Sequence, residues 1–259
     1  MKATNLLVTA GFCVSSASYA ANGCDVKSGA ATAALVELYT SEGCSSCPPA
    51  DRALGQLRRM LAPDAVAVPL ALHVTYWDRI GWKDVFAQKT FDARQAQLLD
   101  SGRRKVAYTP QFFVNGSELR DWSGDLPAAV RRTNAIPAPL TITLKTSFAG
   151  GGTLLLEAAV SARDPRTSGQ LYVALSESAL VSTVLRGENQ GLTLRHDDTA
   201  RLWLGPFSLE RGSALMRQQV LLPAGWQRER LQALAFVQAP DARILQAVST
   251  AQCQSLAGL

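Results

Sequence analysis

The sequence predicts an α/β domain followed by an all-β, sandwich-like domain. In the first half, residues 35–39 and the apolar run at 65–74 are typical of strands buried in a parallel sheet. Leucines at helical spacing within 50–61 predict the helix that joins them. Beyond Pro137, short segments alternate apolar and polar residues between turns, which favours a β-sandwich.

The remaining elements follow from the same patterns. In the first half we expect an insertion of two helices, then a strand at 111–114, a hairpin turn at Asn115-Gly116 and a helix at 126–133. The two inserted helices are placed at 84–91 and 92–99. The strands expected in the second half are 141–144, 153–160, 171–177, 214–222, 234–238 and 244–248.

The N-terminus has the layout of a secretory signal peptide. Lys2 precedes an apolar stretch at 6–14, and Ser18 and Ala20 are the small residues of a cleavage site. That stretch is too short to span a bilayer, and no later segment is long and apolar enough to do so. We therefore expect an exported protein, periplasmic or secreted, with no membrane span in its mature form. The expected units are the signal peptide (1–20), a lead segment (21–34), the α/β domain (35–136) and the all-β domain (137–259).

Composition excludes two classes. With 47% hydrophobic and 18% charged residues, the chain is globular and not disordered. It carries 26 Lys and Arg against 21 Asp and Glu, but the arginine pairs are scattered and no aromatic residues interleave them. This pattern is typical of solvated surfaces, so we expect no nucleic-acid partner.

Four cysteines remain after removal of the signal peptide, and four permit three pairings. Pairing Cys44 with Cys47 leaves Cys24 and Cys253, which lie near the two ends of the mature chain. This is the most economical pairing in an oxidising compartment. We expect Cys24–Cys253 to be a structural disulfide.

Cys44 and Cys47 form a CxxC dithiol where a buried strand leads into a helix. The helix N-terminus stabilises a thiolate, so Cys44 is the expected nucleophile and Cys47 the resolving thiol. A structural zinc site needs four ligands, and the chain has no second CxxC and only two histidines. Glu37 is either a buried carboxylate that moves protons for Cys47 or an exposed strand charge. Asp51 is expected to interact with the helix dipole.

The order strand, turn, CxxC and helix resembles that of thioredoxin-like proteins, which place a cis-proline beside the dithiol. The resemblance implies an α/β thioredoxin-like domain and gives the cis-proline role to Pro110, which follows Thr109 before the strand at 111–114.

Longer motifs resemble a family of unknown function among secreted bacterial proteins, domain of unknown function 1223, which is grouped with thioredoxin-like folds. They are SEGCSSCPPAD at 41–51, HVTYWD at 73–78, GWKD at 81–84, YTPQ at 108–111, and GEN at 187–189 with His196. The resemblance implies a fold and a compartment but no established reaction.

Trp77, Asp78 and Trp82 follow the second predicted strand. Together with Thr109 they either line a substrate groove beside the dithiol, or the indoles seal the sheet while the aspartates cap helices. His73 ends the same strand. Thiolates and imidazole suit copper, so Cys44, Cys47 and His73 form an alternative metal site.

We predict an exported thiol–disulfide oxidoreductase that acts on a thiol or disulfide of a protein or small molecule. It needs no cofactor beyond its own redox-active disulfide and is recycled by a separate redox partner. The direction of the reaction depends on the redox potential and does not follow from the sequence. The alternatives are a non-catalytic binding or chaperone-type module with a structural CxxC disulfide, and a Cu(I) carrier.

Overall fold

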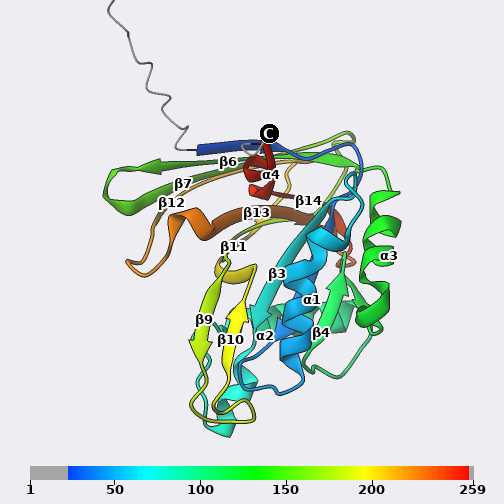
Figure 1. Cartoon of the computed structure of the whole chain (residues 1–259). Coiled ribbons are helices and arrows are strands. Elements are labelled where there is room, and N and C mark those ends of the chain that lie inside the picture. Colours follow the sequence, from blue (N-terminus) through cyan, green and yellow to red (C-terminus); the bar gives the residue numbers. More distant parts are fainter. Residues whose placement is uncertain (1–22, 257–259) are drawn as a thin grey trace, which may run out of the picture.

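One mixed sheet of eight strands runs through both halves of the chain (Figure 1). The computed structural model describes residues 23–256. The sheet order is β14-β13-β8-β11-β3-β2-β4-β5, with β3 parallel to both β2 and β11. Its strands are β2 (Ala34–Thr40), β3 (Ala67–His73), β4 (Gln111–Val114), β5 (Ser117–Leu119), β8 (Gln170–Glu177), β11 (Thr199–Ser208), β13 (Leu231–Gln238) and β14 (Ile244–Ser249).

The predicted fold class is therefore wrong. An α/β thioredoxin-like domain followed by an all-β domain requires two separate sheets, but β11 of the second half pairs with β3 of the first. Thr199 is in register with Ala71, whose backbone N–H donates to the carbonyl of Asp198 at 2.9 Å. A buried strand needs hydrogen-bond partners on both edges, and β11 satisfies the edge of β3 that β2 leaves free. The fold is mainly β.

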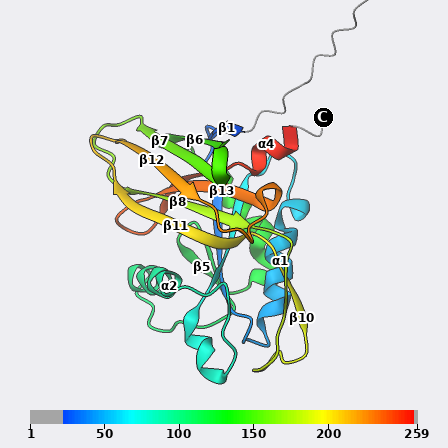
Figure 2. The ribbon, with the colours of Figure 1, turned by 90° about the vertical axis from the view of Figure 1, so that its left-hand side faces the viewer.

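Three helices flank this sheet. α1 (Cys47–Met60) and α3 (Trp122–Asn134) cover one face of the β2–β4 region, and α2 (Lys89–Ser101) covers the other. Figure 2 shows α1 and α2 on opposite sides of the strands. Because side chains alternate along a strand, Val36 and Leu38 of β2 pack under α1, whereas Leu35 and Tyr39 face α2.

A second sheet, antiparallel throughout, has the order β1-β6-β7-β12. Its inner leucines pack against β8, β13 and β14, so this part of the molecule has two packed sheets. The strands are β1 (Gly23–Lys27), β6 (Leu140–Ala149), β7 (Thr153–Ala162) and β12 (Ser213–Leu221). The remaining elements are the hairpin of β9 (Leu180–Thr183) and β10 (Thr193–His196), the short helices η1 (Thr75–Ile80), η2 (Gly150–Gly152) and η3 (Arg228–Arg230), and α4 (Ala251–Leu256).

Most predicted elements of the first half are present, but the helix at 84–91 is not. The chain there is irregular until α2 begins at Lys89. The Asp84 carboxylate explains this, because it accepts hydrogen bonds from the backbone N–H groups of Glu42 and Phe86 and contacts His73. These bonds hold residues 84–86 against the sheet instead of in a helix.

The two ends of the described chain are joined covalently. Cys24 of β1 forms a disulfide with Cys253 of α4, the pairing expected from the sequence. The expected signal peptide, residues 1–20, lies outside the described residues. Within residues 23–256, none of the helices is long and apolar enough to cross a membrane.

Replacing both Cys24 and Cys253 by alanine should lower the free energy of unfolding by about 2–5 kcal/mol, because the bridge closes a very long loop in the unfolded chain. Chemical denaturation of the variant and the wild type would measure the difference. Equal midpoints would show that the packing of β1 and α4 needs no bridge.

Candidate functional site

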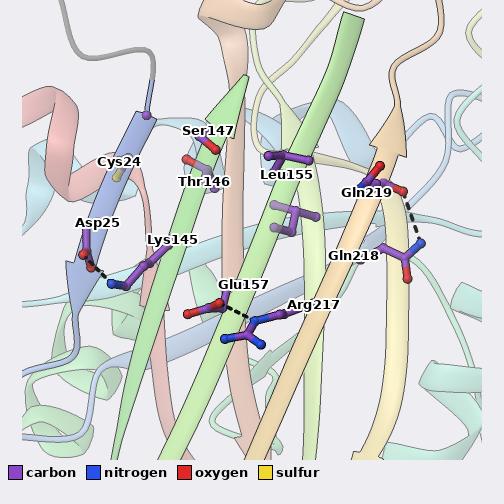
Figure 3. A pocket seen from close by; sticks show the side chains of 12 residues that line it. Cys24, Asp25, Lys145, Thr146, Ser147, Leu155, Glu157, Arg217, Gln218 and Gln219 are labelled. Atoms are coloured by element: carbon purple, nitrogen blue, oxygen red, sulfur yellow. Dashed lines mark hydrogen bonds and ion pairs between the residues drawn. The ribbon is translucent and has the colours of Figure 1, made fainter. Parts of the chain in front are cut away.

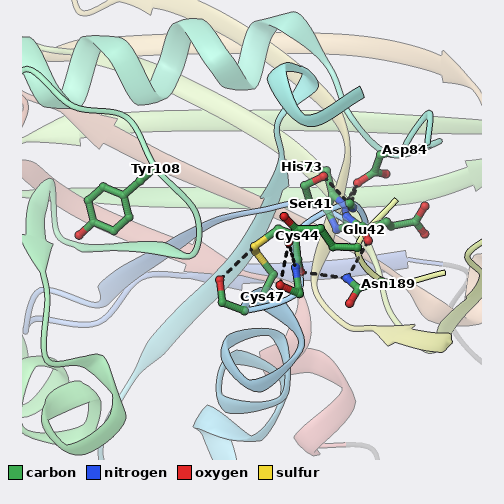
Figure 4. The surroundings of a disulfide bond; sticks show 12 residues. Ser41, Glu42, Cys44, Cys47, His73, Asp84, Tyr108 and Asn189 are labelled. Atoms are coloured by element: carbon green, nitrogen blue, oxygen red, sulfur yellow. Dashed lines mark hydrogen bonds and ion pairs between the residues drawn. A yellow bond between two sulfur atoms is a disulfide. The ribbon is translucent and has the colours of Figure 1, made fainter. Parts of the chain in front are cut away.

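The candidate site is the Cys44–Cys47 disulfide at the N-terminus of α1 (Figure 4). The strand β2 ends at Thr40, and a short turn brings Cys44 to the start of the helix. Pro48 and Pro49 occupy the first helical turn, where backbone N–H groups have no helical partner and proline is tolerated. Both cysteines are 0% exposed, whereas the two residues between them, Ser45 and Ser46, are exposed.

A loop from the second half of the chain holds the CxxC turn. The Asn189 side-chain amide donates to the carbonyl oxygens of Glu42 and Cys44 at 2.8 and 2.9 Å. The backbone N–H and hydroxyl of Ser45 donate to Glu188 Oε2 at 3.0 and 2.7 Å, and these bonds lower the pKa of Glu188. Glu188 and Asn189 both belong to the loop between β9 and β10. The conformation of the dithiol turn therefore depends on residues more than 140 positions away.

A buried polar cluster lies near the disulfide (Figure 4). His73 Nδ1 is 2.7 Å from Asp84 Oδ2, and His196 Nε2 is 3.2 Å from Glu42 Oε1. The two imidazole rings are 5.0 Å apart. Glu42 also accepts hydrogen bonds from the indole of Trp82, at 2.7 Å, and from the hydroxyl of Ser182. Residues from both halves of the sequence thus form one network.

The His73–Asp84 contact is an ion pair by its pKa directions. Burial disfavours the charged imidazolium, but the Asp84 carboxylate, with smaller contributions from Asp51 and Glu42, raises the pKa of His73 above 6.5. Burial likewise opposes ionisation of Asp84, yet the charge and hydrogen bond of His73 lower the pKa of Asp84 below 3.8. Each group therefore stabilises the charged form of the other.

Four buried atoms beside this network have no hydrogen-bond partner within the described chain: Thr40 Oγ1, His73 Nε2, His196 Nδ1 and Asp51 Oδ1. Asp51 was expected to interact with the helix dipole. The structure instead buries its Oδ1 one helical turn after Cys47, and burial raises the pKa of Asp51 above 3.8 although both histidines lower it. The sequence signal for this was the i, i+4 spacing of Cys47 and Asp51 on one helix face.

Glu37 is buried but lies elsewhere. It shares the sheet face of Leu35 and Tyr39, opposite α1, and its two carboxylate oxygens accept hydrogen bonds from Arg94 at 2.9 and 3.1 Å. The Tyr39 hydroxyl also donates to Glu37, at 3.3 Å. Glu37 thus has a buried ion-pair partner on the face away from the dithiol helix.

The Thr109–Pro110 peptide bond is cis, the isomer that the resemblance implied. It directly precedes β4, and the hydroxyl of Thr109 is buried without a hydrogen-bond partner among the described residues. Tyr108, the preceding residue, belongs to the surroundings of the disulfide (Figure 4). The segment that leads into β4 thus approaches the dithiol.

The aromatic and acidic residues of the 77–84 segment support the polar cluster. Trp82 binds Glu42, and Asp78 Oδ1 accepts a hydrogen bond from the backbone N–H of Asp84 at 3.2 Å. Trp77 packs against the core on the α2 face of the sheet, and its indole N–H is buried without a partner in the described chain. These contacts are those of residues that seal the sheet; a groove role for them stays a prediction.

The copper alternative also stays a prediction. His73 keeps only Nε2 for a metal, because Nδ1 is bonded to Asp84. Among residues 23–256, no group of three or more His, Cys, Asp and Glu side chains is arranged to hold a metal ion.

A groove of about 790 Å³ lies elsewhere, on the outer face of the β1-β6-β7-β12 sheet (Figure 3). Its charged side chains pair with one another: Lys145 with Asp25 at 3.1 Å, and Arg217 with Glu157 at 2.6 Å. Because these exposed charges already pair with one another, we place the candidate site at the disulfide and not in this groove.

Comparison with known proteins decides the family. Residues 35–238 match the family described as Protein of unknown function (DUF1223). The chain belongs to this family. The match covers the CxxC turn, the polar cluster and the loop between β9 and β10, so these features lie within the family's own domain.

Two solved structures resemble this DUF1223 protein. HBP35 of Porphyromonas gingivalis matches with a TM-score of 0.66 at 16% identity, covering 86% of this chain and 76% of that one. A crystal structure of an Agrobacterium tumefaciens protein matches with a TM-score of 0.58 at 22% identity, covering 85% of this chain and 94% of that one. At such identities the likeness concerns the fold alone. No curated protein matches the sequence.

Asp84→Asn should destabilise the protein by about 3–5 kcal/mol near pH 6, since it leaves the buried His73 without its counter-charge. Because the folded pKa of Asp84 lies below 3.8, its contribution is present above that value and is lost as pH falls through the folded pKa. The variant should therefore lose less stability on acidification than the wild type does. Urea denaturation from pH 3 to 7 measures both effects.

Glu157→Gln is the matched control, because it breaks an exposed ion pair with Arg217. We expect a change of about 0–1 kcal/mol. An equally small effect of Asp84→Asn would show that the His73–Asp84 pair does not stabilise the fold.

Proposed function

We propose that this protein is an exported thiol–disulfide oxidoreductase whose reactive group is the Cys44–Cys47 pair. The observation that carries the proposal is the position of this disulfide at the N-terminus of α1. Unpaired backbone N–H groups and the helix dipole stabilise a thiolate at such a position, and the thiolate is the reacting form of cysteine.

The chemistry needs no bound cofactor. In the reduced protein, the Cys44 thiolate attacks a disulfide RS–SR′ and releases R′S⁻, leaving the mixed disulfide Cys44–SR. Cys47 loses its proton, attacks Cys44 Sγ and releases RS⁻, which restores the internal disulfide. The protein loses two electrons and the substrate disulfide gains them. The reverse sequence oxidises a substrate dithiol, and a separate thiol or disulfide partner regenerates the starting state.

Access to Cys44 requires a local opening, because its side chain is 0% exposed. The exposed Ser45 and Ser46 mark the side from which a substrate approaches. The opening involves the hydrogen bonds from Asn189 and to Glu188, which hold this turn to the loop between β9 and β10. A small thiol or an extended peptide needs the smallest displacement of this loop.

Export is part of the proposal. The Cys24–Cys253 disulfide ties β1 to α4, and such structural bridges persist in the periplasm and outside the cell. The expected signal peptide supports the same compartment. In that compartment the Cys24–Cys253 disulfide stabilises the fold, and the Cys44–Cys47 disulfide reacts with substrate.

A non-catalytic binding or chaperone-type module is the second candidate, and the full burial of both Cys44 and Cys47 favours it. In that case the CxxC disulfide stabilises the turn at the start of α1 and does not turn over.

A redox titration of the mature protein separates the two. Free thiols are alkylated at each potential and mapped by mass spectrometry. We expect Cys44 and Cys47 to interconvert between about −270 and −120 mV, the span of known dithiol catalysts, while Cys24 and Cys253 stay bonded. A Cys44–Cys47 pair that stays oxidised below about −300 mV behaves as a structural disulfide and contradicts the oxidoreductase proposal.

A further inference from the structure

We propose that Asp51 is the proton acceptor for the Cys47 thiol. This rests on the proposed thiol–disulfide exchange and names the residue that its second step requires. When Cys47 attacks the mixed disulfide, its S–H proton must leave before the sulfur can act as a nucleophile. Cys47 is fully buried, so bulk water cannot take that proton directly.

Helix geometry brings the two side chains together. Cys47 and Asp51 are four residues apart on α1, and side chains at this spacing are neighbours on one helix face. Asp51 Oδ1 is buried and makes no hydrogen bond in the described chain, although the nearby Thr40 hydroxyl lowers the pKa of this carboxyl. A buried carboxylate oxygen without a partner is costly unless it serves a purpose, and it is free to receive a proton.

The other buried carboxylates near α1 or on β2 are already occupied. Glu42, in the turn before Cys44, accepts hydrogen bonds from Trp82 and Ser182 and contacts His196. Both oxygens of Glu37 are bonded to Arg94 on the opposite face of the sheet. Asp198 is bonded to Arg58, near the far end of α1. Asp84 binds His73 and two backbone N–H groups. Asp51 alone among these five carboxylates combines a buried oxygen that makes no hydrogen bond with a position one turn from Cys47.

Charged and polar groups from four neighbouring segments act on Asp51. They are Thr40 at the end of β2, His73 at the end of β3, Asp84 after η1 and His196 at the end of β10. His73 Nε2 and His196 Nδ1 are both unpartnered, while the other nitrogen of each ring is held by Asp84 or Glu42. The nearby charges of the two imidazoles lower the pKa of Asp51 and so stabilise its carboxylate form.

Asp51 accepts the proton that Cys47 loses in this step. Cys47–SH and the Asp51 carboxylate become the Cys47 thiolate and a carboxylic acid. The thiolate then forms the S–S bond with Cys44 and expels RS⁻. The proton on Asp51 passes to RS⁻ when the leaving thiolate is basic, or to water when it is weakly basic. Burial raises the pKa of Asp51. A general base works best when its pKa lies near the working pH, so this shift makes the carboxylate a better proton acceptor.

The test follows the reaction of the reduced mature protein with 5,5′-dithiobis(2-nitrobenzoate), which releases one coloured thiolate when Cys44 attacks and a second when Cys47 resolves. In Asp51→Asn we expect the first release at the wild-type rate and the second slowed about 100-fold near pH 6, the usual scale for loss of a general base. Asp51→Glu should recover part of the rate. The control is Asp198→Asn, which changes a buried carboxylate that pairs with Arg58 of the same helix, and it should leave both releases unchanged.

Carbon-13 NMR of the reduced protein is a second readout that does not depend on exchange. The thiol pKa of Cys47 should change in Asp51→Asn and stay unchanged in Asp198→Asn. If the wild type releases no thiolate, the proposed function fails, and the NMR titration alone decides the role of Asp51. A second release and a Cys47 pKa that are both unaffected by Asp51→Asn would overturn the inference while leaving thiol–disulfide exchange intact.

Discussion

The pairing of β11 with β3 is the contact on which the rest of the structure depends. It joins the two halves of the chain into one sheet through Thr199 and Ala71. The strand β10 ends at His196, only three residues before β11, so this pairing also fixes the β9–β10 hairpin beside the start of α1. Glu188, Asn189 and His196 reach the CxxC turn and its polar cluster for that reason.

The buried polar atoms around the disulfide are of two kinds: those with hydrogen-bond or ion-pair partners and those without. Asp84 and Glu42 each hold one histidine, and these buried contacts fix the loop after η1 and the turn before Cys44. The remaining nitrogens of the two rings and Oδ1 of Asp51 are left without partners in the described chain. Natural proteins keep few buried polar atoms unsatisfied, and those that persist are concentrated where chemistry requires them. The cluster therefore contains both the support and the reactive part of the proposed site.

Local sequence patterns predicted much of the fold. The apolar runs gave β2 and β3, the leucine spacing gave most of α1, and Asn115-Gly116 gave the hairpin of β4 and β5. The prediction failed for long-range strand pairing, because no local sequence pattern indicates that β11 pairs with the free edge of β3. The same limit applies to the site. The CxxC turn follows from its own residues, but the burial of Asp51 and the approach of His196 depend on the hairpin that β11 positions.

The most direct test of the account is to trap the mixed disulfide. In Cys47→Ser the resolving thiol is absent, so a peptide joined to Cys44 stays attached. The folded variant is incubated with a disulfide-bonded peptide, and the adduct is mapped by mass spectrometry without denaturation beforehand. We expect an adduct on Cys44, with Cys24 and Cys253 still bonded to each other. An adduct that forms only after the protein is unfolded would contradict it, because the buried Cys44 would then be closed to substrate in the native state.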